Sequence, residues 1–320
     1  MDVFFNSFVT VSQAVLEIFI LGLAGYLLSR FNVLSQKGLD DVGKVVIYFT
    51  LPALILFNVL GKADLEAVGR WWLYPVGTYL LIAISAGIGL SISGFLDWPD
   101  RRQFAALIAF PNTGYLPLAL TATLLSEPFK SEAFLIIFLI VTGLSAALWS
   151  LGVGLISGKF VNLWDFSKRI ISNPPLVATI TSIALLLLGW EVYVPDLALD
   201  TASLAGGITV PLIMIVLGGQ LANIHVNSRG FVGAISLVIL LKLIIYPALA
   251  LLAIYFVRPP EVIGFVLLLE AATTPATNLV IVGRHYGEET GLLNQGLLYS
   301  YLCAIVTIPA FISLFRLIYS

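Results

Sequence analysis

The stretch FPNTGYLPLAL, Phe110 to Leu120, carries two prolines, one glycine and three polar side chains inside a long apolar run. The surrounding chain is strongly hydrophobic, because 59% of its 320 residues are hydrophobic and only 11% are charged. Ordinary soluble domains have about 25% charged residues, and a soluble fold of this size could not bury so much apolar surface. The composition therefore predicts a membrane protein, in which this stretch interrupts a membrane-spanning segment.

About ten apolar runs are long enough for a spanning helix, which needs about 20 residues. They lack the alternating pattern of membrane barrel strands, so the predicted fold is an all-α membrane protein. The first run is interpreted as a helix and not as a signal peptide, because no Lys or Arg precedes it. The predicted spans are Phe8–Leu28, Leu39–Leu60, Trp72–Leu96, Gln103–Leu125, Glu132–Ile156, Asn173–Trp190, Leu197–Leu221, Phe231–Val257, Glu261–Val282 and Gly291–Leu317.

The distribution of basic residues predicts the orientation, because Lys and Arg in short loops stay in the cytoplasm. Ten basic residues follow odd-numbered spans, and five lie in the other loops and the tails. We therefore expect a multi-pass protein of the cell's inner (plasma) membrane with both termini outside the cytoplasm. The first set is Arg30, Lys37, Lys44, Arg101, Arg102, Lys159, Lys168, Arg169, Arg229 and Arg284, and the second is Lys62, Arg70, Lys130, Arg258 and Arg316.

Several classes of function do not fit the sequence. A net charge of -2 without a basic stripe excludes a nucleic-acid partner. Cys303 is the single cysteine, and His225 and His285 have no metal-ligand spacing, so we predict no disulfide framework and no cofactor, and the sequence assigns no metal ion. An enzyme would need a nucleophile, an acid-base pair or a metal set. A non-transporting receptor or sensor is the alternative of another class, although the short loops leave no room for a soluble signalling domain.

The two halves of the chain show an internal repeat. At a shift of about 159 residues, the stretch from Thr50 to Leu65, TLPALILFNVLGKADL, aligns with the stretch from Thr209 to Ile224, TVPLIMIVLGGQLANI. A shift of 158 residues aligns Pro117 with Pro275. Two copies of five helices must have opposite orientations, which is the inverted-repeat plan of secondary transporters with broken helices near the bilayer midplane. We predict a first repeat at 1–158, a cytoplasmic linker at 159–172 and a second repeat at 173–320, with crossed broken helices in spans four and nine.

The two predicted breaks contain the candidate binding residues. Pro111, Pro117 and Pro275 each remove a backbone donor, so backbone groups near them lose their helical partners. Proline kinks also occur without a ligand, and threonine often bonds back to its own helix. Two breaks at repeat-equivalent positions, both rich in Asn and Thr, favour a polar site. The predicted substrate-binding residues are Asn112, Thr113, Gly114, Tyr115, Thr274, Thr277 and Asn278.

Both breaks resemble motifs of the auxin efflux carrier family, which includes plant PIN transporters and bacterial malonate carriers and is related to bile-acid transporters. PNTGYLPLAL resembles the fourth-helix motif written near NTGYLGLPL, and TTPATNLVIVGRHYG resembles the ninth-helix motif PPAVNAFVLA. The chain departs from the family pattern at Pro117, where glycine is usual, and at Thr274, where the ninth-helix motif has its first proline. It also lacks the long central hydrophilic loop of many plant members.

The resemblance implies a division of the helices and a function. Helices 1, 2, 6 and 7 would form a scaffold that often makes a homodimer contact, and helices 3–5 and 8–10 would form a transport unit. The expected function is secondary active transport of a small carboxylate by an elevator-like, alternating-access mechanism. Amides of the half-helices that resume after about Pro117 and Pro275 favour an anion, which agrees with this expectation. A sodium-coupled, bile-acid-type organic anion symporter is the alternative within transport.

Glu17 and Lys242 lie deep inside predicted spans and Glu270 lies just before the break in the ninth, where charged groups are rare and costly. Glu270, just before the second break, is predicted to couple transport to an ion, either by carrying a proton or by holding Na⁺ together with freed carbonyls. The alternative is a permanent ion pair with Lys242 that serves only packing. For Glu17 in the first span we expect a structural or cavity-lining role.

Overall fold

The computed structural model describes residues 2–62, 64–98, 100–159, 161–224 and 231–319. His225 and Arg229, which were used in the sequence analysis, lie outside the described residues. The described part of the chain consists of helices joined by short loops, with a single isolated β-bridge between Pro111 and Pro275. The prediction of an all-α protein is confirmed.

The helices are named in chain order. The first half contains α1 (Asp2–Arg30), α2 (Gln36–Val45), η1 (Val46–Thr50), α3 (Leu51–Gly61), α4 (Leu65–Val68), α5 (Leu73–Phe95), α6 (Arg101–Ala109), α7 (Leu116–Leu124), α8 (Phe129–Ala147), η2 (Leu148–Gly152) and α9 (Val153–Ser157). The second half contains α10 (Leu163–Ile171), α11 (Pro174–Leu187), η3 (Glu191–Tyr193), α12 (Asp196–Gly207), α13 (Thr209–Ala222), α14 (Val232–Leu240), η4 (Leu241–Ile245), α15 (Tyr246–Val257), α16 (Glu261–Ala272), α17 (Asn278–His285) and α18 (Gly291–Tyr319).

Seven helical segments of the described chain are long and apolar enough to cross a membrane, and an eighth results if α10 and α11, which meet at 74°, form one bent span. The seven coincide with predicted spans one, two, three, five, seven, eight and ten. Predicted spans four and nine each contain two shorter helices, so the layout of ten spans in two inverted repeats remains a prediction. The seven segments are Phe4–Arg30, Gln36–Gly61, Leu73–Phe95, Phe129–Ser157, Asp196–Ala222, Val232–Val257 and Gly291–Tyr319.

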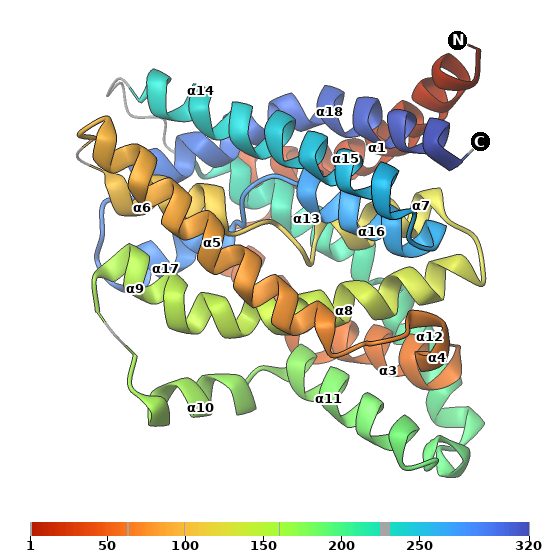
Figure 1. Cartoon of the computed structure of the whole chain (residues 1–320). Helices are drawn as coiled ribbons and strands as arrows, with labels where there is room; N and C mark the ends of the chain where they lie inside the picture. The colour runs from red at the N-terminus through yellow and green to blue at the C-terminus, as the bar shows by residue number, and fades with distance from the viewer. Residues whose placement is uncertain (1, 63, 99, 160, 225–230, 320) are drawn as a thin grey trace.

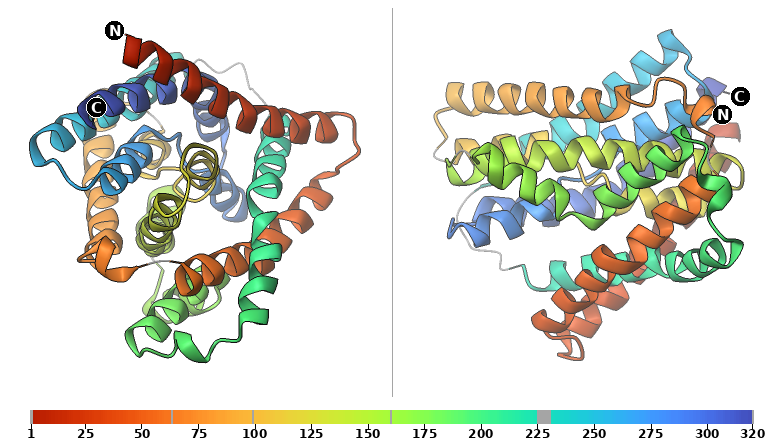
Figure 2. Two further views of the ribbon diagram at one scale, coloured as in Figure 1. Left: turned by 90° about the vertical axis from the view of Figure 1, so that its right-hand side faces the viewer. Right: turned by 90° about the horizontal axis from the view of Figure 1, so that it is seen from below.

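The long helices run roughly side by side, and both termini lie at the same end of the molecule (Figures 1 and 2). Helix α1 packs against α13, and α3 packs against α11 and α12, so helices of the predicted scaffold contact one another. In the predicted transport unit, α5 packs against α6 and α8, while α14 and α16 pack against α18. Each group therefore combines helices from both halves of the chain.

Helices α1 and α13 touch backbone to backbone at two glycines. A Cβ atom on Gly218 would overlap the carbonyl oxygen of Gly22, so a larger residue does not fit there unless the helices move apart. Small residues allow such close approach between membrane helices, where dispersion contacts and not the hydrophobic effect drive association. This contact joins the first and second halves of the predicted scaffold.

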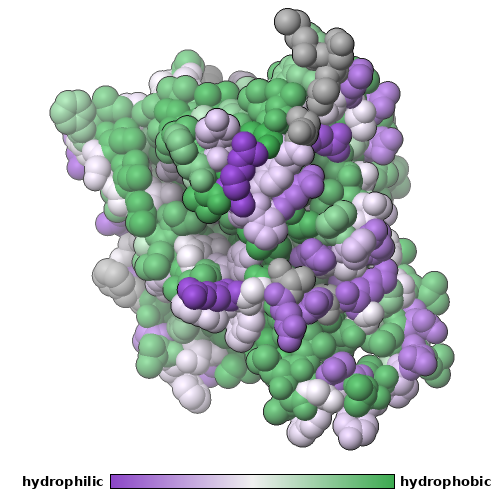
Figure 3. All heavy atoms as spheres, turned by 45° about the vertical axis from the view of Figure 1, so that its right-hand side comes forward, coloured by the Kyte–Doolittle hydropathy of each residue, from purple (hydrophilic) through white to green (hydrophobic). Residues whose placement is uncertain are grey.

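Burial divides the molecule into a centre and a lipid-facing surface. Every residue of α6 from Phe104 to Ala109 is buried, and α16 and α8 are also largely buried, whereas α1 and α5 expose large apolar side chains. Viewed along the bundle, α7 and α8 lie inside a ring of other helices (Figure 2, left). Hydrophobic residues dominate the left of Figure 3, and hydrophilic residues gather on the right, toward the end that carries the termini. The broken helices thus lie in the protein interior.

The predicted linker at 159–172 contains a helix, α10, which the sequence analysis did not predict. Leu163 and Trp164 are exposed on it, while Lys168 and Arg169 lie in its last turn. The Lys168 ammonium lies 4.9 Å from the centre of the Trp164 ring. A short basic helix with exposed apolar residues is typical of a segment that lies in the membrane interface.

Three of the long segments widen into a π-helical turn, at η1, η2 and η4. Pro52 follows η1 by two residues and Pro247 follows η4 by two residues. A proline lacks the amide that would bond four residues back and crowds the preceding turn, which favours such a local widening. The turn η4 contains Lys242, whose side chain is buried at 3% exposure.

Candidate functional site

The two broken segments lose their helical geometry at an X-Pro dipeptide. Helix α6 ends at Ala109, and Phe110, which precedes Pro111, is extended with φ -99° and ψ 107°. The residue before a proline is disfavoured in the helical region, which explains this end. In the second segment α16 ends at Ala272, two residues before the Thr274-Pro275 pair. Helices resume at α7 and α17.

The two breaks cross near the middle of the molecule and are bonded to each other (Figure 1). The Asn112 amide donates to the Thr274 carbonyl at 2.8 Å, and the Ala276 amide donates to the Phe110 carbonyl at 2.9 Å. These two bonds flank Pro111 and Pro275, which face each other in an antiparallel bridge. This is the non-hydrogen-bonded position of an antiparallel pair, where a missing amide leaves no partner unsatisfied.

The bridge changes one detail of the predicted repeat. The alignment of the halves set Pro117 against Pro275, whereas Pro111 is the proline that lies opposite Pro275. Pro117 lies in the first turn of α7, where a proline is tolerated because its amide would have no helical partner. Pro117 therefore starts the second half-helix and does not lie in the gap itself.

The crossing brings most of the predicted polar residues together. Asn112, Thr113, Thr274 and Thr277 are buried, with exposures of 0 to 6%. The Asn112 side-chain amide donates to the Tyr301 hydroxyl on α18, and its carbonyl accepts from the Tyr115 backbone amide at 3.3 Å. The Thr274 hydroxyl has no aligned hydrogen-bond partner among the described residues. The remaining predicted residues, Gly114, Tyr115 and Asn278, are half-buried.

Tyr301 is a candidate site residue that the sequence analysis missed. It is 2% exposed and comes from the tenth predicted span, which was interpreted only as an apolar run. A signal was present, because Tyr301 ends the sequence Tyr-Ser-Tyr and shares its helix with Asn294 and Gln295. Polar side chains buried in a membrane helix indicate a partner or a cavity in the interior.

Both half-helices begin at the crossing without a side-chain cap. No side chain bonds the first amides of α7, whose N-cap is Tyr115, or of α17, whose N-cap is Thr277. By contrast, Asn162 and Asn173 cap α10 and α11 outside the core. Uncapped amides at a helix N-terminus carry partial positive charge and favour an anion.

Two ionisable residues lie beside the crossing. Glu270, in the last turn of α16, is 8% exposed, and neither of its carboxyl oxygens has an aligned hydrogen-bond partner among the described residues. Lys242 is close enough for electrostatic attraction, but no ion pair within 4.0 Å joins the two in the described structure. The Lys242 ammonium group donates instead to the Ile108 carbonyl at 3.2 Å.

Glu17 forms no ion pair or hydrogen bond with the residues of the crossing in the part of the chain that the structure describes. It is exposed on α1, next to Leu16 and Ile20, which are 48% and 62% exposed. The expected structural or cavity-lining role of Glu17 stays a prediction. The residues described here also contain no group of three or more His, Cys, Asp or Glu side chains arranged for a metal ion.

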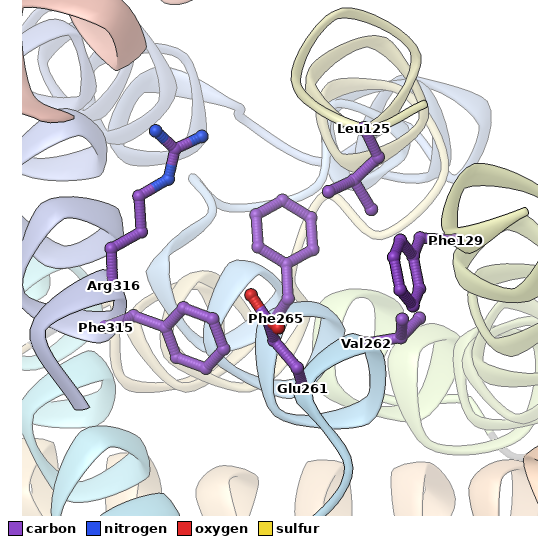
Figure 4. Close-up of a pocket in the computed structure, with 7 residues that line it drawn as sticks. All are labelled: Leu125, Phe129, Glu261, Val262, Phe265, Phe315 and Arg316. Atoms are coloured by element: carbon purple, nitrogen blue, oxygen red, sulfur yellow. The ribbon is translucent and has the colours of Figure 1, made fainter. Parts of the chain in front are cut away.

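A separate cavity of about 100 Å³ opens beside the ends of four helices (Figure 4). The Phe265 ring lies between Phe315 and Arg316 on one side and Leu125 and Phe129 on the other. The lining comes from the end of α7 and the starts of α8 and α16, together with the end of α18. None of the residues predicted to bind substrate lines it.

Comparisons with known proteins agree with the motifs at the crossing. A family model described as membrane transport protein matches residues 10–162 and 160–312. A Methanothermobacter thermautotrophicus protein named "Uncharacterized transporter" is 28% identical, over 93% of this chain and 96% of that protein. "Protein PIN-LIKES 1" of Arabidopsis thaliana is 22% identical, over 98% of this chain and 80% of that protein. A Rhizobium meliloti protein named "Putative malonate transporter" is 24% identical over 96% of each chain.

Proposed function

The chain belongs to the membrane transport protein family, the auxin efflux carrier family that its two motifs resemble, and from this premise we propose that it carries a small carboxylate across the membrane as a secondary active transporter. The crossing of two broken helices supports the proposal most strongly. It places two uncapped helix N-termini and several buried polar side chains in one interior region. The name of the Rhizobium meliloti relative also includes a dicarboxylate.

The proposed substrate site uses neutral donors. The amides that begin α7 and α17 would attract the carboxylate group, and Asn112, Thr274 and Asn278 would orient it. Tyr115 and Thr277 lie at the same helix starts and complete the donor set. Because hydroxyls and amides supply recognition, we expect modest affinity.

Alternating access follows from the burial of these groups. Asn112, Thr113 and Thr274 are buried in the described conformation, which supports a mechanism in which helices move to admit the substrate. We propose that the crossing moves as part of a transport unit (α5–α9 and α14–α18) against a scaffold of α1–α3 and α11–α13. The backbone bonds across the crossing favour motion of both broken segments as one body.

Glu270 is the proposed coupling residue. An unpaired charge is costly in a membrane interior, so a buried carboxyl group without an aligned hydrogen-bond partner among the described residues is suited to exchange a proton or bind a cation. Proton coupling is the version that we propose. Sodium coupling, as in a bile-acid-type symporter, is the second candidate, because the same carboxyl lies near backbone carbonyls freed at the break.

The exposure of Glu17 supports a homodimer through the scaffold. A charged side chain at the centre of a membrane helix costs about 2.5 to 3.5 kcal/mol on insertion scales. A second copy covering the exposed face of α1 would remove Glu17 from lipid.

The location of both termini at one end fits the proposed orientation, in which they lie outside the cytoplasm.

Uptake by proteoliposomes tests the proposed function. Purified protein would be reconstituted and supplied with labelled acetate, malonate and succinate under an imposed proton gradient, an imposed sodium gradient or no gradient. We expect accumulation of at least one carboxylate with the proton gradient, and none in protein-free liposomes. Binding without accumulation or exchange of any of these anions would favour the receptor alternative.

A further inference from the structure

Lys242 occupies a position that resembles a cation site. Its side chain is 3% exposed, and its ammonium group donates to the Ile108 carbonyl at 3.2 Å. The same group lies 5.7 Å from the centre of the Tyr246 ring, within reach of a cation–π attraction. A buried ammonium is thus held by a backbone oxygen and an aromatic face.

The carbonyl that binds Lys242 is one that the helix break sets free. The last four carbonyls of a helix lack internal partners, and α6 ends at Ala109, one residue after Ile108. The Phe110 amide satisfies the Ala106 carbonyl, whereas Ile108 receives the ammonium group. The C-terminal end of a helix carries partial negative charge, which stabilises a cation there.

Glu270 is the acidic group beside this position, on α16, which packs against η4. Both of its carboxyl oxygens are buried without an aligned hydrogen-bond partner in the described chain. The Lys242 ammonium group attracts the Glu270 carboxylate electrostatically, although no ion pair within 4.0 Å joins them in the described structure. The Thr113 hydroxyl also lies near this carboxylate. Freed backbone carbonyls and the C-terminal ends of half-helices coordinate coupling sodium ions in transporters, and the Glu270 carboxylate and the Thr113 hydroxyl would add two further oxygen atoms here.

We infer that the Lys242 ammonium group is a resident cation that fills a potential sodium site between the end of α6 and Glu270. It supplies the positive charge that a bound sodium ion would supply in a sodium-coupled carrier, and it excludes that ion from the crossing. This deepens the proposed function, because it decides against sodium as the coupling ion. Removing the ammonium group while keeping the carboxylate should create a sodium site.

Thermal unfolding of purified protein in detergent tests the inference without any substrate. Melting temperatures would be compared in sodium chloride and choline chloride at equal ionic strength. We expect no sodium-specific shift for the wild type or for Lys242→Arg, which keeps a cation. Lys242→Met and Lys242→Gln should each gain a sodium-dependent rise in melting temperature, because a ligand that binds only the folded state stabilises it.

Two controls define the site. Lys242→Met combined with Glu270→Gln should lose the sodium response, because the carboxylate ligand is absent. Lys44→Met, at an exposed lysine on α2, should behave like the wild type. A sodium-specific rise in the wild type would overturn the inference. The inference would also be overturned if the neutral Lys242 variants folded but showed no sodium response, or if they failed to fold in both salts. In either case sodium would not have replaced the missing positive charge. These outcomes stand apart from transport, so a failed uptake assay leaves them intact.

Discussion

Lys62 and Glu127 form an ion pair of 2.9 Å that joins the end of α3 to the loop leading into α8. Lys130 lies 3.3 Å from the same carboxylate oxygen, and the Ser131 hydroxyl donates to the other oxygen at 2.6 Å. Helix α3 belongs to the proposed scaffold and α8 to the proposed transport unit. This polar cluster therefore connects the two groups where α3 ends and α8 begins.

The pH dependence of stability should report this ion pair. Partial burial alone would raise the pKa of Glu127, but hydrogen bonds from Ser131 and Lys62 outweigh it and lower the pKa from 4.5 to about 2. Because the folded pKa lies below the unfolded one, the stabilisation is complete above about pH 4.5 and is lost as the pH falls toward 2. We expect a small effect, since the carboxylate is 37% exposed.

Melting temperatures of the wild type and Glu127→Gln, measured from pH 7 to pH 3, check this prediction. The wild type should be more stable at pH 7, and the difference should shrink below about pH 4.5 as the wild-type carboxylate takes up a proton. Glu66→Gln, at an exposed carboxyl outside any ion pair of the described structure, is the matched control. A difference that is constant with pH would contradict the assignment.

Substitution of the two asparagines at the helix breaks should impair transport. A hydrogen bond to a charged group contributes about 1.5 to 3 kcal/mol, so Asn112→Ala and Asn278→Ala should each lower uptake at low substrate concentration by about 10- to 100-fold. Membrane insertion should persist. Asn6→Ala, on the exposed start of α1, should transport normally. Normal uptake by both site variants, at wild-type protein levels, would remove them from the proposed site.

Glu270→Gln should separate coupling from translocation. Glutamine keeps the size of the side chain but cannot carry a proton, so accumulation driven by a proton gradient should fall to the equilibrium level. Exchange of labelled for unlabelled substrate should continue, because exchange requires movement only of the loaded carrier. Uptake and exchange measured on the same proteoliposomes check this. A stable variant that still concentrates substrate would show that Glu270 is not the coupling residue.

Cysteine labelling tests the orientation. In a Cys303→Ala background, Lys37→Cys should react with a membrane-impermeant maleimide only after cells are opened, because Lys37 belongs to the predicted cytoplasmic set. Glu66→Cys should react in intact cells. Both positions are exposed, so access to the reagent depends on the side of the membrane. The reverse pattern would invert the topology and place the termini in the cytoplasm.

Oxidative cross-linking tests the proposed dimer contact. In the same background, Glu17→Cys should form a covalent dimer in membranes, since α1 of a second copy would cover this position. Leu81→Cys, on α5, is the control, because Leu81 is 64% exposed but belongs to the proposed transport unit and not to the scaffold. Equal cross-linking at both positions, or none at Glu17, would argue against a dimer through α1.

Several features could be predicted from the sequence because they depend on local chemistry. Long apolar runs with few charges indicate membrane helices regardless of how those helices pack. The sequence could therefore predict the all-α fold class. An X-Pro dipeptide disfavours helical geometry in its own backbone, so Pro111 and Pro275 marked the gaps in two helices. The neighbouring Asn and Thr residues identified polar segments in an apolar interior. These inferences needed no knowledge of which helices are neighbours.

Only the tertiary structure showed which face of each helix points outward and which helices pack against each other. The hydropathy of α1 is nearly uniform, so the sequence could not show that Glu17 faces outward. Tyr301 meets Asn112 across 189 residues of chain, and Lys242 reaches the Ile108 carbonyl across 134. The sequence by itself indicated the two breaks through proline together with its Asn and Thr neighbours, because proline acts on its own backbone. Proline alone was not sufficient, since Pro309 lies inside α18. Only the packing determined which groups satisfy the freed atoms, because a hydrogen bond depends on positions that many distant helix contacts set together.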